Sequence, residues 1–376
     1  MDRPSGKDKP LFTPGPLTTS ATVKEAMLSD LGSRDVAFVQ AVAEIRSGLL
    51  KLAGVSKGEG WESVLMQGSG TFSVESVISS SIPDGGALLV ARNGAYGERI
   101  ATIARCHGIS VYEVISGEGE PVDVDAVTEA LDAHADVTHL AIVHCETTSG
   151  VLNPVEAVGT LTKERGLTYF VDSMSAFGAV PIDLEACHVD FLVSSANKCI
   201  EGVPGFGFAL CRQAALNECE GRARSLSLDL YAQWKGLDTN GQFRFTPPTH
   251  ALLAFHRALA ELEEEGGVTG RKARYQANHA RILAGVQALG LEAYVPEEHQ
   301  CWIITSVRYP ASEAFCFETL YDRLNERGFV IYPGKVTDAN CFRIGNIGRL
   351  FVEDMDALLA ALAQVLSDMG VNTRES

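Results

Sequence analysis

A lysine and an aspartate, 26 residues apart, are the residues of this sequence best suited to covalent chemistry. Lys198 comes shortly after the apolar run Phe191-Leu192-Val193 and directly after the small, polar stretch Ser194-Ser195-Ala196-Asn197. An amine in such surroundings can form an imine with an aldehyde. Asp172 ends another apolar run, and its carboxylate could cap a turn, bind a metal or hold a positively charged nitrogen. From its own segment alone, the lysine could also be structural.

Two further segments could bind a flat, phosphorylated ligand. Ser69, Gly70 and Thr71 precede a helical pattern over residues 72–79, so their backbone N–H groups would lie at the positive end of a helix dipole, which suits a phosphate. Tyr96, in the stretch Asn-Gly-Ala-Tyr-Gly, could stack on a heteroaromatic ring. Taken alone, the first segment could be an ordinary capped turn and the second a core tyrosine.

Together these residues predict a site for pyridoxal 5'-phosphate (PLP). Lys198 would hold the cofactor as a Schiff base, while Asp172 would keep its pyridine nitrogen protonated. A dinucleotide is disfavoured because Ser73 stands where the third glycine of G-x-G-x-x-G belongs. His144-x-Glu146 is similar to half of a zinc deaminase motif, but P-C-x-x-C is missing, so no metal is expected. Thr147, in the same stretch, suits the polar lining of a cofactor pocket.

Short apolar runs that alternate with helical patterns must position these residues. Unbroken apolar runs indicate strands covered on both faces, and hence a mainly parallel sheet with helices on each side, an α/β fold. In such sheets ligands bind beyond the carboxyl ends of the strands, where the residues above are found. The runs are 63–66, 87–90, 140–143, 169–171 and 191–193.

The pattern predicts two domains after a flexible tail at residues 1–10. A large PLP-binding domain would span residues 11–265 and include an amphipathic helix at 36–52. A smaller α+β domain at 266–376 would contain a long helix at 271–289, strands near 302–307 and 329–332, and a last helix from residue 353. The boundary at 265–267 could also be a helix-to-helix connection within one domain.

Composition limits the classes of partner. The 376 residues are 46% hydrophobic, enough for a sizeable core, and 48 acidic against 31 basic residues give a net charge of −17. This charge disfavours nucleic acid and anionic membranes, and a small anionic ligand would need local arginines or lysines. No run approaches the roughly 18 apolar residues of a membrane helix. Nine cysteines without a C-x-x-C pair indicate reduced thiols, so we expect a cytoplasmic protein.

Read together, these segments resemble the class V (fold type I) aminotransferases and, within them, the 2-aminoethylphosphonate:pyruvate group. The general class shares the glycine-serine turn, the aspartate, the lysine and a late Arg-Ile-Gly. The phosphonate group also shares longer stretches, including QGSGTFSVE, NGAYGERI, HCETTSGVLNP, SSANKCIEGVPG, SLSLDLYAQW, RFTPPTH and FVIYPGK. The resemblance implies a PLP-dependent enzyme that converts 2-aminoethylphosphonate and pyruvate to phosphonoacetaldehyde and L-alanine.

The resemblance also implies roles for single residues. Lys198 and Asp172 become catalytic, and Arg343 becomes the arginine that grips the substrate carboxylate. The cofactor-binding residues would be Ser69, Gly70, Thr71, Tyr96, Thr147, Asp172, Asn197, Lys198 and Thr246. Thr246 would reach the phosphate from the second subunit of a homodimer. The phosphonate would use Arg343 as well or another donor, for which Arg34, Arg92 and Arg244 are candidates.

Other functions remain open from the sequence. An alanine:glyoxylate or serine:pyruvate aminotransferase would share the lysine, aspartate and arginine. A PLP-dependent lyase or desulfurase would need a reactive cysteine on a mobile loop, and no cysteine here has that setting. A ligand-binding protein that kept the fold would bind cofactor or phosphonate without turnover.

Overall fold

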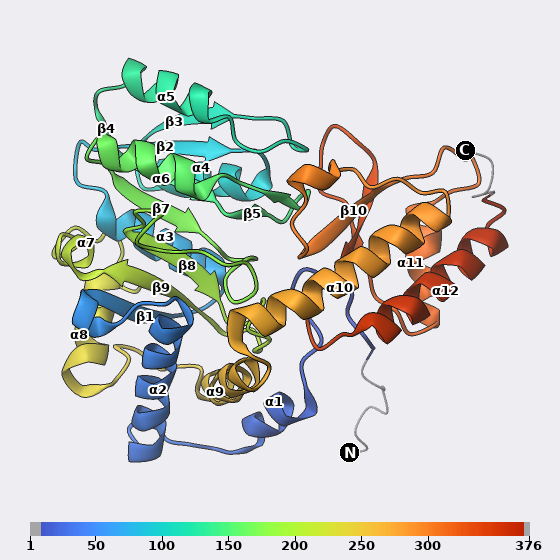
Figure 1. The fold of residues 1–376 in the computed structure, drawn as a ribbon. Coiled ribbons are helices and arrows are strands. Elements are labelled where there is room, and N and C mark those ends of the chain that lie inside the picture. The colour runs from blue at the N-terminus through green and yellow to red at the C-terminus, as the bar shows by residue number, and fades with distance from the viewer. Residues whose placement is uncertain (1–8, 372–376) are drawn as a thin grey trace.

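The computed structural model describes residues 9–371, which form one large sheet, one small sheet and the helices around them (Figure 1). The large sheet has the order β1-β9-β8-β7-β4-β2-β3. All its neighbouring strands pair in parallel except β9, which runs antiparallel to both β1 and β8. In sheet order the strands are β1 (Trp61–Gln67), β9 (Phe206–Arg212), β8 (Phe191–Ser195), β7 (Thr168–Asp172), β4 (Val137–Val143), β2 (Ala87–Arg92) and β3 (Ser110–Ile115).

The five apolar runs of the sequence become β1, β2, β4, β7 and β8, which confirms the predicted α/β fold with a mainly parallel sheet. The runs did not predict β3, an edge strand whose Val111, Tyr112 and Glu113 are only half-buried. They also did not predict β9, although every residue from Phe206 to Cys211 is buried. Glycine and cysteine interrupt the aliphatic run of β9, which weakens its signal.

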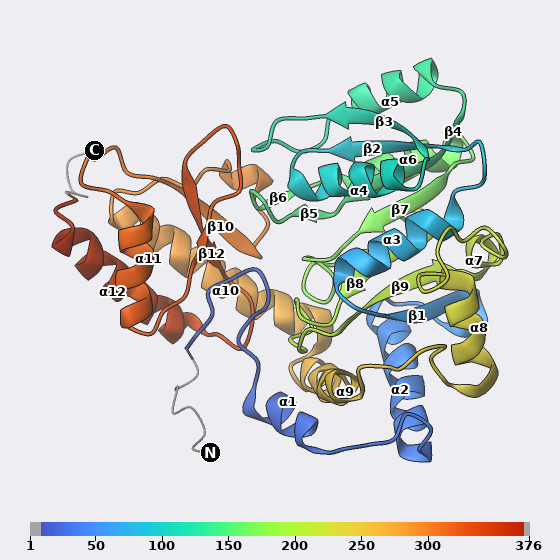
Figure 2. The same cartoon turned by 180° about the vertical axis from the view of Figure 1, so that it is seen from behind.

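Helices cover both faces of the large sheet. Helices α3 and α4 lie in front of it in Figure 2, whereas α6 lies in front in Figure 1. The helices up to β10 are α1 (Ala21–Glu25), α2 (Val36–Leu52), α3 (Gly70–Ser81), α4 (Ala95–Cys106), α5 (Val124–Ala133), α6 (Val155–Glu164), α7 (Gln213–Asn217), α8 (Leu230–Asn240), α9 (Thr249–Glu264) and α10 (Gly267–Ala288), with short 3-10 turns at Ala26–Leu28 and Lys57–Glu59.

The small sheet, of order β10-β12-β11, is antiparallel and packs on α10, α11 and α12. Its strands are β10 (Ile304–Arg308), β11 (Tyr332–Pro333) and β12 (Cys341–Gly345), and its later helices are α11 (Phe317–Glu326) and α12 (Val352–Asp368), with a 3-10 turn at Glu297–His299. A separate two-stranded ladder joins β5 (Cys145–Glu146) to β6 (Val151–Leu152).

The N-terminal segment runs beside the small sheet before the chain enters the large one. Leu11 forms a β-bridge with Val330, and Phe12 is fully buried in the core of the small sheet. The backbone N–H of Gly345 donates to the carbonyl of Phe12 at 2.9 Å. This packing carries the residues after Phe12 across to the carboxyl ends of the large sheet. No helix among residues 9–371 is long and apolar enough to cross a membrane.

Candidate active site

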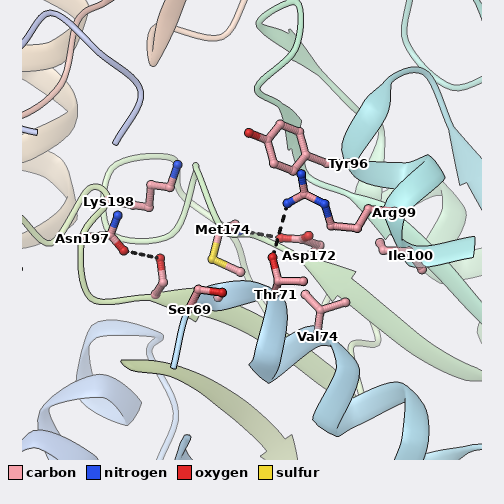
Figure 3. Close-up of a pocket in the computed structure, with 12 residues that line it drawn as sticks. Ser69, Thr71, Val74, Tyr96, Arg99, Ile100, Asp172, Met174, Asn197 and Lys198 are labelled. Carbon is pink, nitrogen blue, oxygen red and sulfur yellow. Dashed lines mark hydrogen bonds between the residues drawn. The ribbon is translucent and has the colours of Figure 1, made fainter. Parts of the chain in front are cut away.

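A pocket lies where the carboxyl ends of β7 and β8 meet the first turns of α3 and α4 (Figure 3). Parallel strands direct their carboxyl ends to one edge, and the loops that follow them form a concave rim there. Seven of the ten residues that the sequence assigned to the site line this pocket: Ser69, Gly70, Thr71, Tyr96, Asp172, Asn197 and Lys198. They come from four loops spread over about 130 residues of the chain.

Lys198 projects into the pocket from the loop after β8. Its Nζ donates a hydrogen bond to the carbonyl of Pro14 at 2.9 Å. Burial lowers the pKa of this amine from 10.5 to about 8, because desolvation disfavours the charged form. The N-terminal segment lies tightly against the lysine: Gly15 has φ +126°, and a Cβ there would be 2.8 Å from Lys198 Cδ. The lysine is therefore held in place and readily becomes a neutral amine.

Asp172 is the buried last residue of β7. Its Oδ1 accepts a hydrogen bond from the Met174 N–H at 2.9 Å, and burial raises the pKa of the carboxyl from 3.8 to about 6. Among residues 9–371, no arginine, lysine or histidine lies within ion-pair distance of it. A carboxylate in this setting is suited to a cationic partner bound in the pocket.

The first turn of α3 has the features of a phosphate site. Ser69 is the N-cap residue, yet its hydroxyl makes no capping bond and stays free for a ligand. The Arg99 Nη1 donates to Thr71 Oγ1 at 3.3 Å, which brings a guanidinium to the positive end of the helix. Gly70 packs closely against Met174, because a Cβ there would come within 2.2 Å of Met174 Sδ and would displace the end of that side chain.

Tyr96, in the first turn of α4, faces the pocket opposite Lys198 (Figure 3). Burial raises the pKa of its phenol. Two cations contact its ring: Arg99 Cζ lies 4.8 Å and Lys335 Nζ 5.5 Å from the ring centroid. An aromatic side chain here can lie against the face of a flat ring whose phosphate is bound at α3.

Arg343 and Thr147 lie next to the pocket rather than in its lining. Arg343, in β12, is buried and donates from Nη1 to the Thr147 carbonyl and from Nε to the Pro333 carbonyl, each at 2.9 Å. The Thr147 hydroxyl pairs with that of Ser175 at 2.5 Å. Burial lowers the pKa of Arg343, and Tyr96 acts in the opposite direction. The guanidinium is thus fixed beside Tyr96, with its second terminal nitrogen free of these two contacts.

Four residues singled out in the sequence lie away from the pocket. Thr246 is exposed in the loop between α8 and α9, near Gln67, whose Nε2 lies 3.4 Å from the Thr246 carbonyl. Of the candidate phosphonate ligands, Arg92 pairs with Glu113 at 2.5 Å and Arg244 donates to a backbone carbonyl. Arg34 is exposed in the turn before α2. None of the three arginines lines the pocket.

Two cations at the site were not expected from the sequence. Arg99 stands three residues after Tyr96 on the same helix, and this spacing places both side chains on one face, a signal that could have found it. Lys335 belongs to the loop between β11 and β12 of the small sheet, and no local pattern links it to Tyr96.

The residues present fit PLP. The free N-cap hydroxyl, the helix start and Arg99 suit a phosphate, while the buried Asp172 without a cationic partner suits a protonated ring nitrogen. Lys198 supplies an amine whose pKa of about 8 permits the neutral form that reacts with an aldehyde.

Comparison with known proteins decides the family. The family pattern described as Aminotransferase class-V matches residues 20–335. The chain belongs to the class-V aminotransferases. A protein of Syntrophobacter fumaroxidans named 2-aminoethylphosphonate--pyruvate transaminase is 49% identical to this class-V aminotransferase over 361 residues, covering 96% of this chain and 97% of the relative. A protein of the same name from Bacillus cytotoxicus is 50% identical over 355 residues, covering 94% and 97%.

Solved structures share the fold of this class-V aminotransferase. An alanine--glyoxylate aminotransferase from Nostoc sp. superposes with a TM-score of 0.90 at 27% identity, covering 97% of each chain. A pyridoxamine-pyruvate aminotransferase from Mesorhizobium loti gives a TM-score of 0.87 at 24% identity, covering 98% of this chain and 95% of the other. The enzyme is a fold type I, PLP-dependent aminotransferase, as the resemblance implied.

Proposed function

We propose that this aminotransferase moves the amino group of 2-aminoethylphosphonate to pyruvate, which yields phosphonoacetaldehyde and L-alanine. The observation that carries the proposal is the 49% identity over 96% of the chain to a relative named for this reaction. The site agrees with it, because Arg99, Lys335 and Arg343 place three positive charges around Tyr96 in a protein of net charge −17. Both proposed substrates are anions that such charges attract.

The roles of the residues follow from their positions. When bound, PLP supplies an electron-withdrawing ring that takes up the electron pair left on the amino-bearing carbon. Ser69, Gly70 and Thr71, with Arg99, would hold its phosphate. Tyr96 would lie against its ring, and Asp172 would keep the ring nitrogen protonated. Asn197 would add a polar contact from the pocket lining, whereas Thr147 would act from beside the pocket, where its hydroxyl pairs with Ser175.

Lys198 would perform the proton transfer. As a free amine, Nζ with a pKa of about 8 would be about one-tenth neutral at pH 7, far more than an exposed lysine. In its neutral form Nζ would take up the proton from the amino-bearing carbon and release it again later in the reaction. Arg343 would pair with the carboxylate of pyruvate through a planar guanidinium.

A product assay tests the substrate assignment. The PLP-loaded enzyme is incubated with 2-aminoethylphosphonate and pyruvate, and L-alanine and the aldehyde are quantified in parallel. We expect equal amounts of the two products. The main alternative is an alanine:glyoxylate or serine:pyruvate aminotransferase, a type represented among the structural relatives. Turnover of L-alanine or L-serine with glyoxylate, but none of 2-aminoethylphosphonate, would overturn the proposal in favour of that alternative.

We also propose that two copies form a homodimer with shared sites. Phe72 and Phe245 are 50% and 45% exposed, and the Phe245 carbonyl accepts from Gln67 Nε2 at 3.0 Å at the end of β1. Exposed apolar rings beside the phosphate turn support a second copy at this face. Such a copy could direct Thr246 at the neighbouring phosphate.

Site complementation tests the dimer. Lys198→Ala and Thr246→Ala chains are unfolded together, refolded and assayed, with sedimentation to establish chain exchange. Recovery of activity above that of either refolded variant is expected, because mixed dimers contain one site with both native residues. No recovery despite exchange would contradict a shared site.

The division of the chain and its compartment are proposed as well. We propose a large domain at residues 11–265 and a small one at 266–376, since each sheet has its own core and α9 ends at Glu264 before α10 begins at Gly267. A cytoplasmic location is supported by the nine cysteines, all of which are free thiols.

A further inference from the structure

Three cations lie around Tyr96 without a direct ion pair to a described residue, although the buried Glu146 attracts Lys335 and Arg343 at longer range. Among residues 9–371, Arg99, Lys335 and Arg343 form no ion pair with an aspartate or glutamate, whereas most arginines of the chain do. Mutual repulsion makes such a group unfavourable until an anion binds. Three anions would bind near these cations: the cofactor phosphate, the carboxylate of pyruvate and the phosphonate of the amine substrate.

Two of the three cations, Arg99 and Arg343, already donate hydrogen bonds to protein atoms. Arg99 donates to Thr71 Oγ1 in the first turn of α3, so its charge would serve the cofactor phosphate there. Arg343 gives Nε and one Nη1 hydrogen to the carbonyls of Pro333 and Thr147. The remaining donors of a guanidinium so held match one carboxylate.

The ammonium group of Lys335 has no hydrogen-bond partner among the described residues, but hydrogen bonds hold the loop that carries it. Among the described residues its Nζ makes no hydrogen bond or ion pair, and it lies 5.5 Å from the Tyr96 ring centroid. On one side of it, the Gly334 N–H donates to the Cys341 carbonyl at 2.9 Å. On the other side, Thr337 Oγ1 donates to Glu118 Oε2 at 3.1 Å.

The positive charge of Lys335 helps to lower the pKa of the Lys198 amine. Burial is the main reason that the pKa of Lys198 is lowered, and repulsion from Arg343 and Lys335 adds to it. Lys335 and Arg343 are also joined through the backbone, because the Pro333 carbonyl that accepts from Arg343 Nε stands two residues before Lys335. The two cations therefore act on the same part of the pocket.

We propose that Lys335 binds the phosphonate group of the amine substrate beside Arg343, and so selects a phosphonate over a carboxylate of equal chain length. This inference rests on the proposed function. A phosphonate has three oxygens and carries up to two negative charges, whereas a carboxylate has two oxygens and one charge. A second cation with three N–H donors thus favours the phosphonate more than the carboxylate.

The test compares two amines that differ only in this group: 2-aminoethylphosphonate and β-alanine, its carboxylate counterpart. L-alanine reports on the other half-reaction. Second-order rate constants for loss of the cofactor's lysine-bound absorbance are measured for wild type, Lys335→Gln and Lys335→Arg. Lys235→Gln is a matched control, because Lys235 Nζ also lies over an aromatic ring, 5.0 Å from the Trp234 centroid, but away from the pocket.

We expect Lys335→Gln to slow the reaction with 2-aminoethylphosphonate by about tenfold or more, as for loss of a charge-assisted hydrogen bond. The reactions with β-alanine and with L-alanine should slow by about twofold or less. Lys335→Arg should recover most of the rate, and Lys235→Gln should match wild type. An inhibition assay gives a second readout: ethylphosphonate should inhibit Lys335→Gln about tenfold more weakly than wild type, with propionate unchanged.

Two other outcomes would overturn the inference in distinguishable ways. Equal losses for the phosphonate and the two alanines in Lys335→Gln would show a structural role for the lysine, while the proposed function stands. A wild type that reacts with L-alanine but not with 2-aminoethylphosphonate would contradict the proposed function itself, and the role of Lys335 with it.

Discussion

The amine of Lys198 combines two properties that a transaminating lysine needs: a fixed position and a neutral form at moderate pH. The Pro14 carbonyl accepts its hydrogen bond, and burial lowers its pKa to about 8. An exposed lysine, with a pKa near 10.4, would have a far smaller neutral fraction at the same pH.

This predicts how covalent capture of PLP depends on pH. Only the neutral amine attacks the aldehyde, so in the cofactor-free protein the capture rate should rise with pH and level off above about 8. Stopped-flow absorbance between about pH 6 and about pH 10 measures it. A rate that still climbs at the upper end of this range would show that the lysine is not desolvated.

Asp172→Asn should separate stability from activity. The pKa of this carboxyl in the folded protein, about 6, lies above its ordinary value of 3.8, so the group favours folding when protonated and loses that contribution as pH rises through about 6. Above that pH the buried charge costs stability. Asparagine can keep the acceptor for the Met174 N–H but carries no charge.

For Asp172→Asn we therefore expect an unchanged or higher Tm of the cofactor-free protein near pH 8, with a smaller difference near pH 5. Transamination should fall by about a hundredfold or more, because the ring nitrogen loses its counter-ion. Thermal unfolding at both pH values and a steady-state assay measure these effects. A lower Tm near pH 8, or wild-type turnover, would contradict this account of the residue.

How far the sequence predicts the site depends on which element carries each residue. Ser69, Tyr96, Asp172 and Lys198 follow strands that run in the same direction in the large sheet, so the strand pattern brings them to one edge. Lys335 could not be found in this way. Its approach to Tyr96 depends on how the loop between β11 and β12 packs against the large sheet, which leaves no periodic signal in the sequence.

At the scale of elements, a buried ionic network ties the lysine loop to α10. Glu201, three residues after Lys198, pairs with Arg274 at 2.7 Å and with the fully buried Arg271 at 3.4 Å. Glu265, just before α10, pairs with Arg271 at 2.8 Å and with Arg274 at 2.7 Å. The network thus holds the loop that carries Lys198 against the helix that leads to the small sheet.

Breaking this network should lower the free energy of unfolding far more than breaking an ion pair on the surface. Arg271→Met leaves Glu201 and Glu265 with one cation between them in a buried setting, and we expect a loss of about 3–5 kcal/mol in unfolding free energy. The matched control is Arg281→Met in the same helix. The side chains of Arg281 and Asp356 are both exposed, so breaking this pair should lower the unfolding free energy by about 0–1 kcal/mol. Urea unfolding measures both variants, and equal effects would contradict a structural role for the network.

The sequence predicts the limits of two helices more closely than those of a two-residue strand, although the helix expected at 271–289 begins earlier, at Gly267. The apolar spacing of residues 36–52 coincides with α2 (Val36–Leu52), and the last helix begins within one residue of its expected start. By contrast, the strand expected near 329–332 is only the short β11 (Tyr332–Pro333). A two-residue strand is defined by its pairing with β12 rather than by its own side chains, so its limits cannot be read from local composition.

At the scale of the whole molecule, the site draws on both sheets. The large sheet supplies the loops that would hold PLP, whereas β12 and the preceding loop bring Arg343 and Lys335 toward the substrate side. The N-terminal segment joins the two parts, since Phe12 packs in the core of the small sheet and Pro14 contacts Lys198. The proposed cofactor site and the proposed phosphonate contact thus come from different parts of the chain.

A single-turnover absorbance experiment tests the central claim most directly. The yellow, PLP-loaded protein is mixed with 2-aminoethylphosphonate alone, and pyruvate is added afterwards, with Lys198→Ala as the control. The account predicts conversion of the lysine-bound cofactor band to the pyridoxamine band, reversal by pyruvate, and no such cycle in the variant. An unchanged band in the wild-type protein would contradict the phosphonate assignment, and a protein that never acquires the yellow band would contradict the role of Lys198 itself.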